Sequence, residues 1–150
     1  MFRFARVFTM LLLSVVPATA FAGPAEDASA VIDRWAQTYS GNDADGLVKL
    51  YTPDAILLGT VSPVINQGSA AIRGYFARLP GSGSKVAIGE RRTVVLSDTA
   101  VLGTGFYEFT AMQEGKPVPN PSRFTMIVVK RGDDWLIAHH HSSRRPEPPK

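Results

Sequence analysis

Hydrophobic residues in the first half of the chain recur at the spacing of helices. Between residues 24 and 40 they return every three or four positions, which predicts one long amphipathic helix. Its apolar positions are Ala28, Val31, Ile32, Trp35, Ala36 and Tyr39. Asp43 can cap a second, short helix, and Gly68 begins a third that we expect to end at Leu79.

The hydrophobic period changes from helical to two in the second half of the chain, which predicts strands. We expect four long strands, at residues 85–96, 100–112, 122–131 and 135–142. Two short β-rich runs, 55–59 and 61–66, precede the third helix. Prolines cannot donate to a strand ladder, so we expect a loop at Pro117, Pro119 and Pro121.

The order of these elements indicates the fold class. Helices followed by an antiparallel sheet predict an α+β domain in which a curved sheet wraps around helices on one of its faces. Such a sheet cannot close completely around three helices. We therefore expect a pocket at its open end, which is where a ligand would bind.

The N-terminus has the pattern of a secretory signal peptide. Arg3 and Arg6 precede an apolar run, and Ala20-Phe21-Ala22 supplies small residues for signal peptidase. We expect cleavage of residues 1–22, a single domain over 23–146, a disordered tail at 147–150, and a periplasmic or secreted protein. The apolar run is too short for a permanent transmembrane helix, so we expect no membrane contact after cleavage.

Composition and charge exclude several classes of function. The 150 residues include no cysteine, which excludes disulfides, thiol catalysis and thiolate metal sites. The formal net charge of +3 would fall by two with the signal peptide, and the remaining basic residues are scattered pairs. Because a phosphate-binding surface needs a basic stripe, we expect no nucleic-acid partner.

Several motifs resemble the nuclear transport factor 2-like superfamily. The ending from Gly132 to Ser143, GDDWLIAHHHSS, is similar to the last hairpin of the association domain of calcium/calmodulin-dependent protein kinase II and of SnoaL-like proteins. Supporting motifs, in matching order over about residues 27–146, are a helix with Trp35, then Tyr51-Thr52-Pro53-Asp54-Ala55, then Gly68 and Arg73-Gly74-Tyr75-Phe76. The resemblance implies a cone-shaped α+β fold with a cavity and assembly into dimers or rings. We expect no kinase domain before this one.

Three consecutive histidines lie on the last predicted strand. Alternation places His139 and His141 on one face of the strand and His140 on the other. If a two-residue turn closes the hairpin, Met126 pairs with His139 and Phe124 with His141. By resemblance, we place these four side chains in the cavity.

Imidazole among apolar side chains can act as a general base near neutral pH. The resemblance also places Glu108 and Phe106 in the cavity, with Glu108 as the catalytic carboxylate. The alternative is structural: the histidines are hydrogen-bonded members of the sheet and Glu108 is exposed. A His-x-His pair also suits a metal completed by carboxylates, but we predict no metal site and no cofactor.

Arg73, Tyr51 and Trp35 complete the candidate ligand-binding set. Arg73 could clamp a carboxylate through two parallel hydrogen bonds, or it could be a surface charge or a partner of Asp54. Tyr51 and Trp35 either line the cavity or belong to the hydrophobic core.

The leading functional hypothesis is an exported homodimer or larger ring that binds a small, largely apolar molecule in its cone. One alternative is an isomerase, cyclase or dehydratase with a cavity histidine as its base. The other is an oligomerisation module without a ligand. An open cavity favours binding or catalysis, whereas a cone plugged by Phe106, Phe124 and Met126 favours the oligomerisation module.

Overall fold

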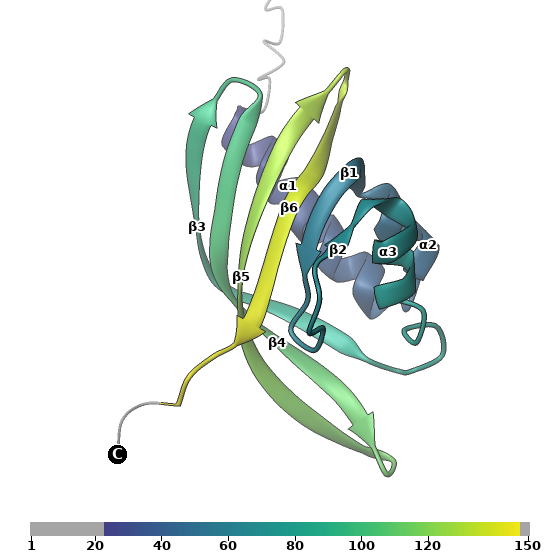
Figure 1. Ribbon diagram of the computed structural model, residues 1–150. Helices are drawn as coiled ribbons and strands as arrows, with labels where there is room; N and C mark the ends of the chain where they lie inside the picture. The colour runs from purple at the N-terminus through teal and green to yellow at the C-terminus, as the bar shows by residue number, and fades with distance from the viewer. Residues whose placement is uncertain (1–22, 148–150) are drawn as a thin grey trace, which may run out of the picture.

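The computed structural model describes residues 23–147 (Figure 1), so the predicted signal peptide lies outside the described residues, as does most of the predicted tail. The elements, in chain order, are α1 (Pro24–Ser40), α2 (Ala44–Lys49), β1 (Tyr51–Leu58), β2 (Asn66–Gln67), α3 (Gly68–Tyr75), β3 (Lys85–Ser97), β4 (Ala100–Gln113), β5 (Lys116–Arg131) and β6 (Asp134–Arg144). The predicted α+β class is confirmed.

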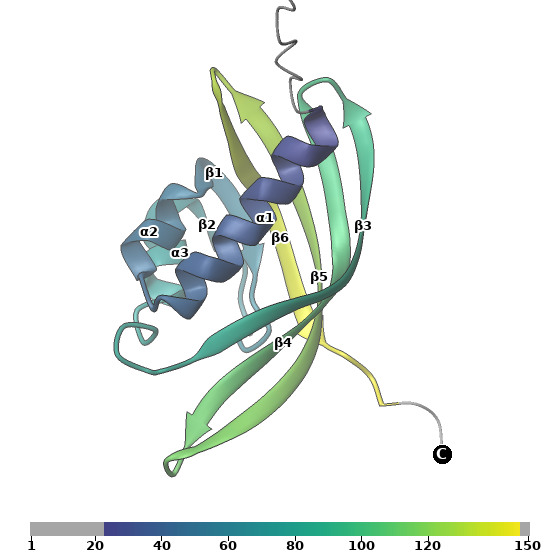
Figure 2. The ribbon, with the colours of Figure 1, turned by 180° about the vertical axis from the view of Figure 1, so that it is seen from behind.

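One curved sheet contains all six strands in the order β2-β1-β6-β5-β4-β3. Neighbouring strands are antiparallel except β1, which runs parallel to β6. Helix α1 lies across one face of the sheet, and α2 and α3 lie beside β1 (Figure 2). We call the face under α1 the inner face and the opposite face the outer face.

Helix α1 begins and ends where the pattern predicts. Pro24 stands in its first turn, where a missing N–H is harmless, and Glu26 and Asp27 complement the positive end of the helix dipole. Its buried side chains face the sheet, and they are Ala28, Val31, Ile32, Trp35 and Ala36. The predicted cap of α2 is also confirmed, because the Asp43 carboxylate accepts the Gly46 N–H at 2.8 Å.

Two predictions around α3 are wrong in extent. The helix ends at Tyr75, and residues 76–78 continue as a turn, although Phe76 and Leu79 are buried as the apolar spacing requires. Only Asn66 of the predicted 61–66 run is in a strand, since β2 is just two residues long. Pro63 interrupts that run, and it cannot donate to a ladder.

The expected loop at the three prolines is instead the first part of β5. Pro117, Pro119 and Pro121 pair with β4 residues Met112, Thr110 and Glu108. β6 ends opposite Ser122, and the next residue, Arg145, donates its N–H to the Pro121 carbonyl at 2.9 Å. Before Pro121, β5 has a neighbouring strand on one side only. Successive residues of a strand direct their N–H groups to alternate sides. Prolines at every second position therefore remove N–H groups only from the side of β5 that faces away from β4, which we call its open side, and the ladder with β4 stays intact.

The last hairpin contains a β-bulge that the sequence did not predict. Arg131 pairs with Asp134 across the expected two-residue turn, and Val128 pairs with Ile137. The next pair is Ile127 with His139, so Ala138 has no partner of its own. Every residue after Ala138 is therefore shifted by one position relative to our prediction.

Candidate functional site

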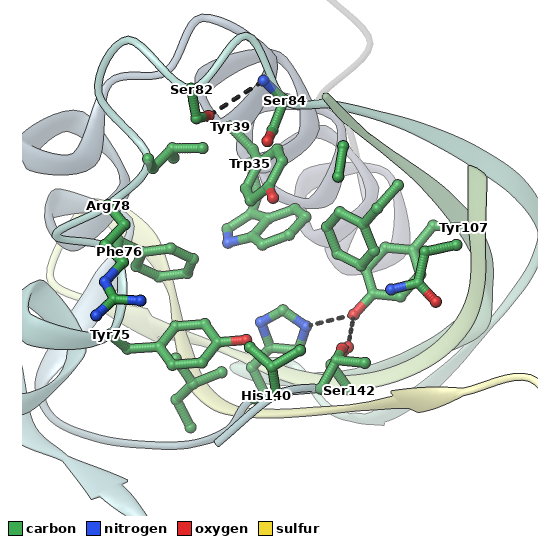
Figure 3. Close-up of a pocket in the computed structure, with 18 residues that line it drawn as sticks. Trp35, Tyr39, Tyr75, Phe76, Arg78, Ser82, Ser84, Tyr107, His140 and Ser142 are labelled. Carbon is green, nitrogen blue, oxygen red and sulfur yellow. Dashed lines mark hydrogen bonds between the residues drawn. The ribbon is translucent and has the colours of Figure 1, made fainter. Parts of the chain in front are cut away.

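A cavity of about 270 Å³ lies between the helices and the inner face (Figure 3). Most of its wall is aromatic or aliphatic, and its lining includes Trp35, Tyr39, Leu57, Gly59, Thr60, Val61, Tyr75, Phe76, Arg78, Leu79, Tyr107, Phe109, Ala111, His140 and Ser142. Arg78 is the one side chain of this lining that carries a full charge, and it is exposed. The cavity therefore suits a small molecule that is mostly apolar.

Aromatic rings are packed against one another over one wall of the cavity. Trp35 stacks on Tyr39 with ring centroids 5.5 Å apart, and the Trp35 ring meets His140 edge to face at 5.0 Å. Tyr107 and Phe109 lie with centroids 4.6 Å apart. These contacts fix the rings of the wall, so the shape of the cavity is preformed.

His140 is at the centre of a buried hydrogen-bond chain. Only 1% of its surface is exposed. The Tyr51 hydroxyl lies 2.9 Å from Nδ1 of His140, and the Tyr107 hydroxyl lies 3.3 Å from Nε2. The Trp35 indole N–H donates to the Tyr51 oxygen at 2.8 Å. Every polar atom of the His140 side chain therefore has a partner.

The chain continues to the cavity wall beyond His140. The Tyr107 hydroxyl donates to the Ser142 hydroxyl, which is hydrogen-bonded to the hydroxyl of Thr60 (Figure 3 shows the bonds of Tyr107). Thr60 and Ser142 both line the cavity. A polar path thus runs from the core beneath α1 to the cavity.

The tautomer of His140 follows from the donors at its two nitrogens. An indole N–H can only donate, so the Tyr51 oxygen accepts from Trp35. The buried Tyr51 hydrogen then has one acceptor, Nδ1 of His140, which must be unprotonated. Consequently Nε2 carries the hydrogen and donates to Tyr107, whose own hydrogen goes to Ser142.

Burial keeps all of these groups neutral. Desolvation, with smaller contributions from His139 and His141, lowers the pKa of His140 to about 3. Burial also raises the pKa of Tyr107 and raises that of Tyr51 well above its ordinary value. The arrangement can hydrogen-bond a ligand, but the Nδ1 lone pair is already occupied and does not suit a general base at neutral pH.

The predicted orientation of the three histidines is wrong because of the bulge at Ala138. Its extra residue puts His140 opposite Met126 and Ser142 opposite Phe124, all four of them buried on the inner face. His139 is only half-buried, and His141 is exposed and lines a groove on the outer face. The predicted cavity pair is thus replaced by the single residue between them.

The predicted placement of Glu108 and Phe106 in the cavity is also wrong. Residues 101, 103, 107 and 109 of β4 face inward, so Glu108 is exposed and Phe106 lies on the outer face, where the Arg145 guanidinium stands 4.1 Å from its ring centroid. Gly103 packs so closely on α1 that a Cβ atom would come within 2.5 Å of Ile32 Cδ1. Because glycine has no side chain, Gly103 adds nothing to the hydrophobic pattern of β4. The sequence pattern therefore does not indicate which face of β4 points inward.

The remaining predicted residues have mixed placements. Trp35 lines the cavity, and Tyr51 lies behind it in the hydrogen-bond chain. Phe124 and Met126 are buried in the core and do not line the cavity. Arg73 is away from the cavity, because its Nε donates to the Asp45 carboxylate of α2 at 2.5 Å. Its side chain is 42% exposed.

Several residues of the site were not predicted. They are Thr60, Tyr75, Arg78, Tyr107, His140 and Ser142. Tyr107 has a usable signal, since it alternates with Phe109 and with the buried Val101 along one strand face. Thr60 lies in the turn after β1, where no periodic pattern exists.

The described part of the chain has neither a cluster of metal-ligating side chains nor a membrane-spanning helix. Within residues 23–147, no group of three or more histidine, aspartate or glutamate side chains is placed to hold a metal ion. No helix in this range is both long and apolar enough to cross a bilayer.

Comparison with known proteins adds a family match and structural neighbours. A family model described as SnoaL-like domain matches residues 28–146. A Xanthomonas campestris structure described as a calcium/calmodulin dependent protein kinase II association domain is 32% identical, with a TM-score of 0.78 over 90% of this chain and 95% of that one. No curated protein matches the chain.

More distant structures share the fold. An NTF2-like protein with a cystatin-like fold from Novosphingobium aromaticivorans is 16% identical, with a TM-score of 0.69 over 79% of this chain and 80% of that one. A protein from the same organism described as a scytalone dehydratase is 11% identical, with a TM-score of 0.72 over 80% and 83% of the two chains. At these identities the likeness concerns the fold, which hosts unrelated chemistries.

Proposed function

This chain belongs to the SnoaL-like domain family of the nuclear transport factor 2-like superfamily, as its motifs predict, and on that premise we propose that it binds a small, largely apolar molecule in its cavity. The observation that carries the proposal is the preformed aromatic cavity of about 270 Å³. Drug-sized ligands usually occupy about 300–1,000 Å³, so a molecule with one or two rings fits this cavity best.

Binding is preferred over catalysis because of the groups that line the cavity. None of its lining residues, all within the described range 23–147, is an aspartate or a glutamate. His140 already accepts a hydrogen bond at Nδ1 and remains neutral. An isomerase or dehydratase needs a base that can take a proton from its substrate, and no lining group is arranged for that step.

Binding is also preferred over a purely structural role, because the cone is open. The aromatic residues expected to plug it, Phe106 and Phe124, lie on the outer face and in the core, respectively. Arg78 at the mouth supports a ligand with a negative group at its exposed end, since a guanidinium pairs well with a carboxylate.

Export and self-association are part of the same proposal. The signal-peptide pattern at residues 1–22 supports export. Half-buried apolar side chains of the outer face, among them Ile127, Val129 and Leu136, support a second copy covering that face. Light scattering should show no stable monomer at micromolar concentration, and a monomer would contradict this part of the proposal.

Native mass spectrometry of the protein purified from its own host tests the binding function. We expect a small-molecule adduct that is lost in Ala111→Phe, because Ala111 lines the cavity and a phenyl ring there would fill it. Ala87→Phe on the exposed side of β3 is the matched control and should keep the adduct. An adduct that survives Ala111→Phe would contradict binding in this cavity.

A further inference from the structure

The loop between β1 and β2, residues 59–65, exposes its aliphatic side chains to water. Val61, Val64 and Ile65 are 75%, 63% and 65% exposed, and no other large hydrophobic residue within 23–147 is exposed to this extent. Single apolar residues on a surface are ordinary. Three of them at the tip of one hairpin mark a surface that contacts a protein or a membrane.

Hydrogen bonds inside the loop hold this tip in shape. The amide of the buried Asn66 donates to the Ser62 hydroxyl at 3.0 Å, and it lies 3.3 Å from the Val64 carbonyl oxygen. The Ser62 hydroxyl donates to the same carbonyl at 3.0 Å, and the Ser62 N–H donates to the Gly59 carbonyl at 3.1 Å. Because these polar groups are paired within the loop, the tip can enter an apolar medium without leaving them unsatisfied.

The tip stands on the rim of the cavity. Thr60 and Val61 both line the cavity, although Val61 is mostly exposed. Arg78, at the end of the turn after α3, lines the same cavity and is also exposed (Figure 3). A surface that covers the tip therefore also faces the cavity mouth.

The chain around the mouth carries only positive charge. Residues 55–89, which supply the loop, α3 and the start of β3, contain three basic residues and no aspartate or glutamate. Arg73 is paired with a carboxylate of α2, whereas Arg78 has no carboxylate partner within residues 23–147. Lys85 donates to a backbone carbonyl, which leaves its charge without a counterion. Apolar side chains beside basic ones are the combination that binds an anionic lipid surface.

A second copy of the chain suits this tip less well than a bilayer does. Each partner in a stable protein interface buries about 800 Å², and three side chains on one hairpin tip fall far short of that area. Two copies that met through this region would also bring like charges together. A bilayer needs no complementary shape, because aliphatic side chains can enter the boundary between its headgroups and acyl chains.

We propose that the tip formed by Val61, Val64 and Ile65 docks on an anionic lipid surface, with Arg78 and Lys85 against the lipid phosphates. Docking through a loop tip needs no spanning segment, so this proposal replaces our expectation of no membrane contact. The docking does not depend on what the cavity binds. A further consequence rests on the proposed function: the cavity mouth faces the bilayer, and its ligand is a molecule that partitions into lipid.

Flotation of the protein, purified from its own host, with lipid vesicles in a density gradient tests the docking. The vesicles contain three parts phosphatidylcholine to one part phosphatidylglycerol, or phosphatidylcholine alone. We expect wild type to bind the anionic vesicles. The double variant Val64→Gln with Ile65→Gln should lose about tenfold or more in partition coefficient, because two apolar side chains no longer enter the lipid.

The matched control is Val94→Gln with Leu96→Gln on β3. These side chains are 52% and 54% exposed and do not line the cavity, so the control pair should bind vesicles as wild type does. A control pair that loses as much binding as the loop pair would overturn the proposal. So would wild type that leaves the anionic vesicles unbound, or a loop pair that loses self-association in light scattering while it keeps vesicle binding.

The charge contribution has its own measurement. Arg78→Gln should weaken binding to the anionic vesicles by about threefold to fivefold at low salt, the effect of one basic side chain near an anionic surface. Equal binding of wild type to vesicles with and without phosphatidylglycerol would overturn the recognition of anionic lipid.

Ala111→Phe separates docking from ligand binding. It fills the cavity and leaves the tip unchanged, so it should bind vesicles as wild type does. Loss of vesicle binding in this variant would place the lipid in the cavity and overturn docking through the tip. Normal vesicle binding by a wild type that carries no small-molecule adduct would contradict the proposed function and leave the docking intact.

Discussion

His140 and His141 are neighbours in the chain, yet the sheet directs their side chains to opposite faces. On the inner face, His140 is buried, neutral and bonded at both nitrogens. On the outer face, His141 is exposed in a groove that also contains Arg92 and Arg123, and charged groups there remain in contact with water. Environment, not residue type, decides whether an imidazole belongs to a site or to a surface.

The same contrast applies to polar groups in general. On the inner face, hydroxyls of Tyr51 and Tyr107 are bonded to other buried side chains, so each depends on its partner. On the outer face, Arg92 pairs with Glu90, and both side chains are largely exposed. Loss of an inner partner leaves a buried group unsatisfied, whereas water replaces an outer partner.

Alanine substitution of the three histidines should show the largest difference between the faces. His140→Ala removes one partner from each of the Tyr51 and Tyr107 hydroxyls, leaves the buried Tyr51 hydrogen without its acceptor and opens a cavity in the core, so we expect a loss of about 3 to 5 kcal/mol in unfolding free energy. His139→Ala and His141→Ala should change it by less than about 0.5 kcal/mol. Urea denaturation measures all three, and equal losses would remove the contrast.

Acid should destabilise the protein through His140. The folded-state pKa of about 3 lies below the ordinary 6.5 of an unfolded histidine, so the unfolded chain binds the proton first. The stability is complete above pH 6.5 and is lost as the pH falls toward 3, at about 1.4 kcal/mol per unit. His140→Gln should lack this slope in pH-dependent urea melts; an unchanged slope would show that His140 does not cause it.

Removal of one hydroxyl from each face gives a smaller and more closely matched test. Tyr107→Phe breaks the bonds to His140 and Ser142 without changing the shape of the cavity, and should reduce the unfolding free energy by about 1 to 2 kcal/mol. Thr125→Val removes a half-buried outer hydroxyl that lies 3.2 Å from Thr104, and should change it by less than about 0.5 kcal/mol. Thermal melts that rank the two variants in reverse would contradict the comparison.

The smallest expected effect concerns the two arginines on and after α3. Arg78 lines the cavity mouth, whereas Arg73 is bound to Asp45. Arg78→Gln should weaken binding of benzoate by about twofold to fivefold at low salt, and Arg73→Gln should not. Calorimetric titration with benzoate decides between them, and a loss with Arg73→Gln alone would restore the original prediction for that residue.

The fold could be predicted from the sequence because its signals are local and repeated. The apolar spacing of α1 and the cap at Asp43 each depend on residues a few positions apart. The site could not be predicted in the same way. Its centre depends on a one-residue bulge at Ala138 and on inward-facing Gly103, neither of which changes the hydrophobic pattern. A shift of one position was enough to exchange His140 for its two neighbours.

The three prolines of β5 have a consequence for growth of the sheet by other chains. An exposed strand edge normally offers both donors and acceptors, and it can recruit a strand from a second molecule into an aggregate or fibril. Along the open side of β5, Pro117, Pro119 and Pro121 lack the donor. The Pro121 carbonyl already accepts the Arg145 N–H, so an incoming strand would meet only the carbonyl oxygens of Pro117 and Pro119 and could form only half of its ladder. We therefore expect the first part of β5, residues 116–121, to resist edge-to-edge aggregation.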